Sequence, residues 1–154
     1  MKHNVGKGRK SGRILEAVIL IALPILAHYL IPIMIVIPKP YSYVGLVLMI
    51  IGLALNTWAA MEFRREGTGF QLQGGMSTLV TTGPFRYGRN PMYLGMLLWL
   101  LGLAILLGSI VAFIFPVVVF FLANFWIIPM EERRMVLTMG EAYLEYKKRV
   151  RRWF

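Results

Sequence analysis

The 154-residue chain contains no cysteine and no aspartate, and it has only two histidines. Without cysteine it has no disulfides, no thiolate nucleophile and no cysteine-ligated metal site. Without aspartate it has neither a Ser-His-Asp triad nor an aspartate that could accept a phosphoryl group. These absences exclude several common classes of hydrolase and phosphotransferase, and we expect no bound metal.

Acidic side chains are scarce, whereas apolar and basic ones are abundant. Hydrophobic residues make up 58% of the chain, and 17 Lys and Arg face only 7 acidic residues, for a net charge of +10. A soluble domain of this size would struggle to bury so much apolar side chain, so a lipid bilayer is the expected solvent. No soluble fold then remains to present a basic face, and we expect no nucleic-acid partner. The length suits one domain, residues 1–154.

Four apolar segments predict an all-α, multi-pass membrane protein. They are Ile14–Ile37, Tyr41–Phe63, Pro91–Leu107 and Ile110–Ile128. The first would span ~36 Å as a helix at 1.5 Å per residue. It lacks a cleavage site and is too long for a signal peptide, so we expect it to be retained. Only Gly108-Ser109 separates the last two segments, which predicts a helical hairpin. Glycines within the spans predict close helix approach: Gly45, Gly52, Gly95 and Gly102.

A polar amphipathic helix is expected after the last span, over Met130–Val150. It begins with acidic and ends with basic residues, as the helix dipole favours. Its Tyr143 and Tyr146 are expected to pack it onto the membrane surface. With four spans, Lys39 is the only one of the 17 Lys and Arg on the far side of the membrane. The positive-inside rule therefore predicts that the N- and C-termini are both cytoplasmic.

The segment TTGPFRYGRNPMYLG, residues 81–95, is polar and rich in glycine between two spans. In the simplest interpretation, Asn90 caps the third helix and Pro91 occupies its first position. Arg86 and Arg89 would then mark the membrane boundary. The free N–H groups of such a helix start also suit a carboxylate or a phosphate, so a structural role and a binding role are compatible.

A family resemblance sharpens the second interpretation. The stretch STLVTTGPFRYGRNPMYLG (77–95), the hairpin after it, the pair Glu131-Glu132 and GEAYLEYKKRV (140–150) resemble the isoprenylcysteine carboxyl methyltransferase family. The wider group includes membrane phospholipid methyltransferases. The resemblance implies a cytosol-facing site for S-adenosyl-L-methionine over roughly 71–150, covered by the C-terminal helix. It also implies a lipid or prenylated small-molecule substrate that enters from the surrounding membrane lipids.

The resemblance also implies which residues contact the cofactor. They are Gln73, Ser77, Thr78, Leu79, Val80, Phe85, Asn90, Pro91, Met92, Tyr93, Glu131 and, with weaker support, Glu132. Without the resemblance, the two glutamates would only complement a helix dipole. Asn90 and Tyr93 are expected to position the reactants, and no catalytic base is identified. Methyl transfer from a sulfonium mainly requires alignment and exclusion of water, which suits a chain without aspartate or cysteine.

Two departures from the family pattern concern the acceptor. Asn90 stands where the isoprenylcysteine enzymes have histidine, and Asn-Pro-Met-Tyr is closer to the phospholipid methyltransferases. Ile127 stands where those enzymes have an arginine that contacts substrate. The acceptor is therefore left open between an isoprenylcysteine carboxylate, a phospholipid amine and another amphiphile. Alternatives of other classes are a non-enzymatic membrane scaffold or lipid-binding subunit, and an NADPH-dependent reductase, although no Gly-rich dinucleotide motif is present.

Overall fold

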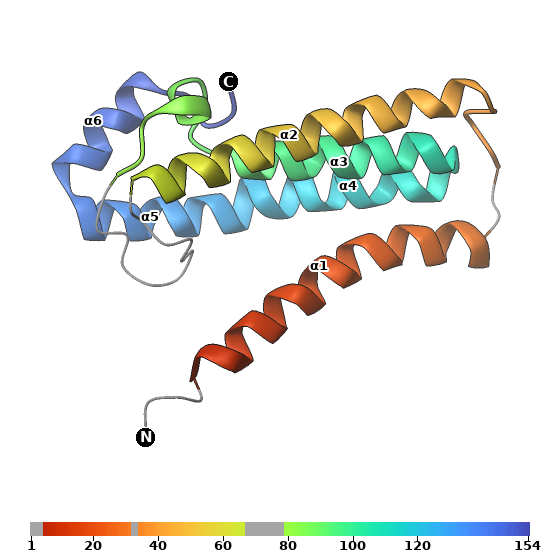
Figure 1. The fold of residues 1–154 in the computed structure, drawn as a ribbon, viewed down its shortest axis with the longest axis horizontal. Helices are drawn as coiled ribbons and strands as arrows, with labels where there is room; N and C mark the ends of the chain where they lie inside the picture. Colours follow the sequence, from red (N-terminus) through yellow and green to blue (C-terminus); the bar gives the residue numbers. More distant parts are fainter. Residues whose placement is uncertain (1–4, 32–33, 67–78) are drawn as a thin grey trace.

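The protein is described by a computed structural model that covers residues 5–31, 34–66 and 79–154. These residues form helices and no β-strand, which confirms the all-α fold. The helices are α1 (Val5–Leu30), α2 (Val44–Arg65), α3 (Pro91–Leu107), α4 (Ile110–Leu122), α5 (Ile128–Met139) and α6 (Glu141–Arg149). Short 3₁₀ turns cover Tyr41–Tyr43 and Gly83–Arg86, and a π-helical turn, Ala123–Ile127, joins α4 to α5. Figure 1 shows α2, α3 and α4 as an elongated bundle with α6 folded over one end.

Close contact between α2 and α3 depends on glycine. A Cβ at Gly52 would overlap the carbonyl of Gly95 and come within 2.8 Å of the amide nitrogen of Trp99. A Cβ at Gly45 would likewise overlap the carbonyl of Gly102. The two backbones therefore touch directly, as small residues allow in membrane helix pairs. The predicted role of these four glycines is confirmed.

The hairpin between α3 and α4 forms where the sequence predicts it. Gly108 ends α3 with φ +67°, a left-handed conformation that favours glycine. Its amide donates to the carbonyls of Ala104 and Ile105, each at 3.0 Å. Its carbonyl accepts from the amide of Val36 at 2.7 Å, which ties the segment after α1 to this turn.

The first helix differs from its predicted bounds. It covers Val5–Leu30 rather than Ile14–Ile37, and Pro24 lies inside it. The α conformation is disfavoured for the residue before a proline, which explains an end before Ile31. Residues 34–37 instead bond to the hairpin turn. In Figure 1, α1 leans away from the bundle toward the N-terminus.

The predicted polar helix over Met130–Val150 is wrong at its start and in its middle. The long helix that begins as α4 continues through the π-helical turn and α5 to Met139, and Gly140, with φ +56°, separates α5 from α6. The π-helical turn changes which side of the long helix is buried. The buried positions Ala123, Ile128 and Glu132 are spaced five and then four residues apart. The extra residue rotates α5 and brings Glu132 to the packed face.

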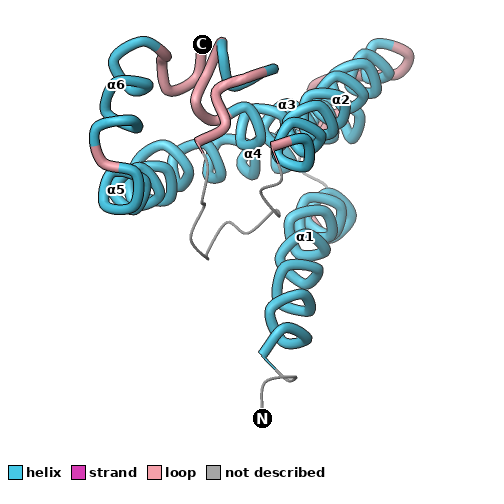
Figure 2. The backbone as a smooth tube through the Cα atoms, turned by 60° about the vertical axis from the view of Figure 1, so that its left-hand side comes forward, coloured by secondary structure: helices cyan, strands magenta, loops and turns pink. Residues whose placement is uncertain are grey.

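Two described stretches are long and apolar enough to cross a bilayer, Tyr41–Arg65 and Ile110–Met139. Val18–Leu30 and Pro91–Leu107 are shorter apolar helices. The end of α2, the segment 79–90 and α6 gather at the same end of the bundle (Figures 1 and 2). This arrangement is the one that four spans require, and the four-span topology itself stays a prediction.

Candidate active site

Residues 79–90 return the chain from the end of α2 to the start of α3, and they turn sharply at Gly83. The φ of Gly83 is +57°, and a Cβ there would come within 2.5 Å of Cγ of Glu62. The Glu62 carboxylate accepts from the hydroxyl of Thr82 and from Nη1 of Arg65, each at 3.1 Å. Glycine is therefore required at this turn, and a carboxylate from α2 holds the turn in place.

A small apolar cluster lies beneath this turn. It consists of Ala59, Phe63, Val80 and Phe85, with Met92 packed against it. The ring of Phe85 meets that of Phe63 edge to face, with centroids 5.0 Å apart. Three residues that the resemblance assigns to the cofactor, Val80, Phe85 and Met92, thus share one cluster contributed by α2, the segment 79–90 and α3. Leu79, another assigned residue, is half-buried at the start of the segment.

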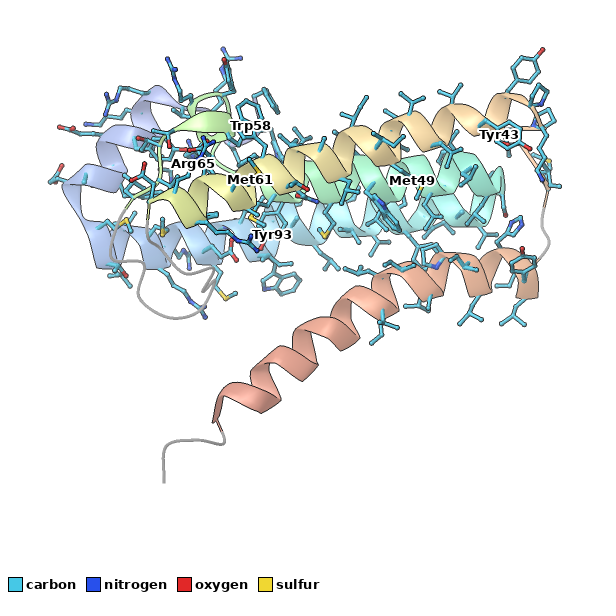
Figure 3. The ribbon with its side chains drawn as sticks, in the orientation of Figure 1. Tyr43, Met49, Trp58, Met61, Arg65 and Tyr93 are labelled. Atoms are coloured by element: carbon cyan, nitrogen blue, oxygen red, sulfur yellow. The ribbon has the colours of Figure 1, made fainter. Side chains whose placement is uncertain are left out.

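Tyr93 and Glu131 come together from two different helices. The Tyr93 hydroxyl, in the first turn of α3, donates to Oε1 of Glu131, near the start of α5, at 2.9 Å. Tyr93 lies toward the end of the bundle that carries Arg65 and far from Tyr43 (Figure 3). Within the described ranges Glu131 forms no ion pair. A carboxylate has two acceptor oxygens, so Glu131 keeps capacity for a further donor.

Asn90 occupies the predicted capping position but uses its side chain differently. Pro91 is the first residue of α3, and the Asn90 carbonyl accepts from the amide of Leu94 at 3.2 Å. The expected side-chain cap is not formed. The amide Nδ2 of Asn90 instead donates to the carbonyl of Arg152 at 3.1 Å. The prediction of a side-chain cap is wrong because the backbone of the C-terminal residues lies against the Asn90 side chain and supplies an acceptor.

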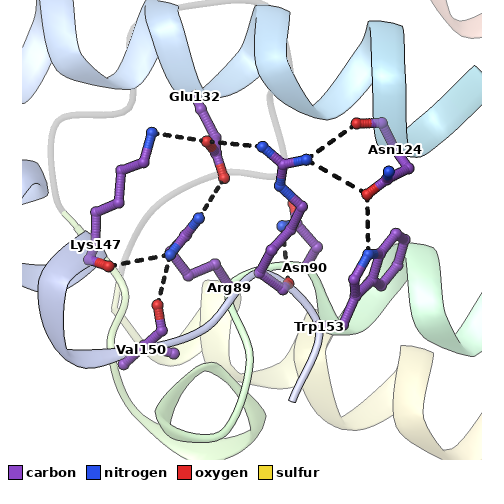
Figure 4. A network of polar contacts seen from close by, with 8 residues as sticks. Arg89, Asn90, Asn124, Glu132, Lys147, Val150 and Trp153 are labelled. Carbon is purple, nitrogen blue, oxygen red and sulfur yellow. Dashed lines mark hydrogen bonds and ion pairs between the residues drawn. The ribbon is translucent and has the colours of Figure 1, made fainter.

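Glu132 is the centre of an ion-pair network (Figure 4). Its Oε1 accepts from Nη2 of Arg89 at 2.7 Å. Its Oε2 lies 2.9 Å from Nζ of Lys147 and 3.5 Å from Nη2 of Arg152. Both oxygens of Glu132 are thus occupied by cations of the chain, in contrast with Glu131. These contacts favour a positioning role for Glu132 over direct contact with a cofactor.

Arg89 is predicted to mark the membrane boundary, and its side chain lies inside the protein. Only 8% of its side chain is exposed, because it is enclosed between α5 and the end of α6. Besides Glu132, its guanidinium donates through Nη1 to the carbonyls of Lys147, at 3.1 Å, and Val150. Arg86, by contrast, is exposed. The buried ion pair thus secures the segment before α3 to the C-terminal part of the chain.

The C-terminal tail, residues 150–154, runs beside Gly88 and Arg89. The amide of Arg89 donates to the carbonyl of Arg151 at 3.0 Å, and Gly88 pairs in parallel with Arg151. A Cβ at Gly88 would overlap the carbonyl of Trp153, so glycine is needed for this close approach. The tail therefore packs along the segment that precedes α3, through one isolated β-bridge and the backbone hydrogen bond of Arg89.

The tail is also bound to the π-helical turn through Asn124. Nη1 of Arg152 donates to the backbone carbonyl and to Oδ1 of Asn124 at 3.1 and 3.3 Å. The Trp153 indole donates to the same Oδ1 at 3.1 Å, and its ring stacks on Phe120. Asn124 therefore holds two residues of the tail at the π-helical turn.

Tyr143 and Tyr146 are buried in the protein rather than packed on a membrane surface. The hydroxyl of Tyr146 donates to the carbonyl of Phe85 at 2.7 Å. Burial raises the pKa of Tyr146, so its hydroxyl stays protonated and available as a donor. The prediction for these tyrosines is wrong because α6 folds onto the segment 79–90, where their rings are covered.

Three assigned residues, Gln73, Ser77 and Thr78, lie outside the described residues, and their roles stay predictions. Several residues of the observed site were not singled out from sequence as site residues: Glu62, Arg89, Lys147, Arg152 and Trp153. Their partners are far away in sequence, for example 43 positions between Arg89 and Glu132. The available signal was basic charge: Arg89 stands near the end of the segment 79–90, and Lys147 and Arg152 stand at and after the end of α6. Basic residues at such positions usually indicate a solvated surface.

Comparison with known proteins shows which family the sequence matches. The family model described as phospholipid methyltransferase matches residues 41–142. A protein-S-isoprenylcysteine O-methyltransferase of Schizosaccharomyces pombe is 36% identical over 72 residues, which are 47% of this chain and 30% of that protein. The protein of the same name from Xenopus laevis is 32% identical over 117 residues, 71% of this chain and 38% of that protein. The chain thus spans about a third of the length of these relatives.

A solved structure shares the fold. It is described as a eukaryotic intramembrane Ras methyltransferase, an isoprenylcysteine carboxyl methyltransferase, and it matches with a TM-score of 0.63 at 23% identity. The match covers 97% of this chain and 52% of that one. Together with the apolar helices, these similarities support an integral membrane protein.

Proposed function

Because this chain belongs to the phospholipid methyltransferase family, we propose that it transfers a methyl group from S-adenosyl-L-methionine to a lipid-soluble acceptor in the membrane. We also propose that the site and both chain termini lie on the cytoplasmic side of the membrane. It takes an isoprenylcysteine carboxylate as the first candidate acceptor, since two relatives are named protein-S-isoprenylcysteine O-methyltransferase. The relatives are longer than this chain, so the activity itself is part of the proposal.

The contact between Tyr93 and Glu131 is the observation that carries the proposal. These two residues are 38 positions apart in sequence, and the resemblance assigns both to the cofactor. Their side chains meet at 2.9 Å, and Met92, the neighbour of Tyr93 in the first turn of α3, packs against the apolar cluster that contains Phe85. A half-buried tyrosine–carboxylate pair with unused acceptor capacity is more than a helix-packing contact needs, and it suits a polar ligand.

The residues present fit the chemical parts of S-adenosyl-L-methionine. The Glu131 carboxylate can accept from its hydroxyl or amino groups. Phe85 and Met92 can lie against its adenine ring. Because Asn90 does not cap α3 with its side chain, no side chain of the described residues bonds to the first-turn amides of Met92 and Tyr93, and these amides can bind the cofactor carboxylate.

The bound cofactor supplies a methyl group on a sulfonium, which is an activated leaving group. The chain has to hold acceptor and donor in line and to exclude water. Tyr93 and Glu131 orient the donor from α3 and α5, and the apolar cluster keeps that side of the site dry. A carboxylate acceptor needs no base, since it is already ionised. An amine acceptor has to lose its proton before it attacks.

A phospholipid amine is the second candidate acceptor, because two observations favour it. The family model that covers residues 41–142 is that of the phospholipid methyltransferases. The motif at Asn90 and the absence of arginine at Ile127 also depart from the isoprenylcysteine pattern in the residues expected to meet the acceptor. Ile127 is 36% exposed at the π-helical turn and offers only an apolar contact.

The decisive experiment is incubation of the purified protein with methyl-labelled S-adenosyl-L-methionine and an extract of native lipids. We expect label in the organic phase, and less of it with Glu131→Gln. Mild base separates the acceptors, because a methyl ester releases labelled methanol and an N-methyl group does not. A folded protein that labels no lipid under any condition would support the scaffold or lipid-binding alternative.

A further inference from the structure

The network around Glu132 joins three parts of the chain that are remote in sequence. We call it the C-terminal clamp: the side chains of Arg89, Glu132, Lys147 and Arg152, together with the backbone of the tail 150–154 (Figure 4). It includes the segment before α3, the start of α5, the end of α6 and the tail. Its centre is buried, since 6% of the Glu132 side chain and 8% of the Arg89 side chain are exposed.

The clamp lies directly beside the proposed donor site. Arg89 precedes Tyr93 by four residues, and Glu132 follows Glu131. The start of α3 and the start of α5 are therefore linked twice, by the Arg89–Glu132 ion pair at 2.7 Å and by the Tyr93–Glu131 hydrogen bond at 2.9 Å. The position of Arg89 relative to Glu132 therefore also sets the distance between Tyr93 and Glu131.

The tail is an integral part of the clamp. Arg152 reaches both Oε2 of Glu132 and the carbonyl of Asn124, and the carbonyl of Arg152 accepts from Nδ2 of Asn90. The tail therefore orients Asn90 through its backbone and compensates the Glu132 charge through its side chain. Loss of the tail would leave the Asn90 side chain without this acceptor and the buried Arg89–Glu132 pair more open to water.

We propose that the tail 150–154 forms part of the methyl-donor site. Glu132 is a positioning residue that couples docking of the tail to binding of the donor. This inference rests on the proposed function, because it concerns the same site. Coupling between two equilibria is reciprocal. If the docked tail favours donor binding, then the bound donor must hold the tail in place by the same factor.

The first test measures affinity for S-adenosylhomocysteine, the stable product of the donor, by calorimetry in detergent. Two variants break the clamp in different ways: Glu132→Gln, and a chain that ends at Val150. We expect each to bind about tenfold more weakly, within the usual range of coupling between sites. The matched control is Arg149→Ala, an exposed arginine of α6 outside the clamp, and it should bind like the wild type. Elution volume and melting without ligand check that each variant folds.

The second test uses the wild-type protein alone, so it does not depend on the folding of a variant. Carboxypeptidase Y trims the exposed Phe154 and the residues before it, and mass spectrometry follows the loss. We expect S-adenosylhomocysteine to slow trimming past Trp153 several-fold. A merely structural tail would be trimmed at the same rate with and without ligand.

The outcomes separate the two claims. Wild-type binding with unchanged affinity in folded Glu132→Gln and in the shortened chain would overturn the clamp and leave the proposed function standing. Wild-type binding with ligand-independent trimming would also overturn the clamp. A folded wild type that binds no S-adenosylhomocysteine would overturn the proposed function, and the clamp with it.

Discussion

The hydroxyl of Tyr93 donates to Oε1 of Glu131 at 2.9 Å, and this contact is one of the two that join the start of α3 to the start of α5. The adjacent Glu132 has a different environment, since three cations surround it. Two neighbouring glutamates thus have separate tasks. One is available to a ligand, and the other holds the surrounding chain in place.

This division of tasks predicts different effects when each glutamate is replaced by glutamine. Glu131→Gln should weaken binding of S-adenosylhomocysteine about 10- to 150-fold, since a charge-assisted hydrogen bond contributes about 1.5–3 kcal/mol. It should leave the melting temperature without ligand nearly unchanged. Glu132→Gln should lower that melting temperature, because it leaves the buried Arg89 without its counter-charge. Thermal melting with and without ligand measures both effects, and the reverse pattern would contradict the assignment.

Tyr93→Phe should preserve the fold and reduce affinity for the donor. The ring stays in place, and only the hydrogen bond to Glu131 is removed. The matched control is Tyr87→Phe, because the Tyr87 side chain is exposed. We expect a loss of binding in the first variant alone, measured by titration of S-adenosylhomocysteine. Equal affinity in both variants would mean that the Tyr93–Glu131 contact only packs two helices together.

Asn90 offers a test of the observed contact against a conventional helix cap. Asn90→Ala and Asn90→Asp both lose the donor to the carbonyl of Arg152. Each should be destabilised by about 0.5–1.5 kcal/mol, the usual contribution of one hydrogen bond, and aspartate should be no better than alanine. If the side chain capped α3 instead, aspartate would match the wild type, because the two residues are equivalent caps. Melting curves of the three proteins decide the matter.

The four-span topology predicts opposite sides for the two ends of the bundle. The chain has no cysteine, so single cysteines can be introduced as labels. Tyr41→Cys and Arg149→Cys both replace exposed residues, one at each end. We expect a membrane-impermeant maleimide to label Arg149→Cys only after it gains access to the cytoplasmic side and Tyr41→Cys from outside. Labelling of both variants from one side would refute the topology.

The helices that were predicted best begin and end at residues that favour helix ends. Pro91 and Gly108 bound α3, and its predicted residues are the observed ones. The end of α4 was not predictable in this way, because the helix passes Pro129 without a break and rotates through a π-helical turn that has no recognised sequence signal. The resulting shift of one residue decides which glutamate faces Arg89.

The candidate site could be anticipated in part. The family resemblance pointed to Tyr93 and Glu131 as cofactor residues, and the structure shows that they are in contact. It could not indicate Arg89 or Arg152, because their partners lie on elements that meet only after the tail folds back. Buried ion pairs between remote segments leave no periodic pattern in a sequence, so they become visible only in three dimensions.

The central claim is that this site binds a methyl donor, and calorimetric titration of S-adenosylhomocysteine into the wild-type protein tests it most directly. The protein should be in detergent, monodisperse and cooperatively melting, with Glu131→Gln titrated beside it. The account predicts saturable binding of one ligand per chain for the wild type and much weaker binding for Glu131→Gln. No binding by the folded wild type, or equal binding by the two proteins, would contradict it.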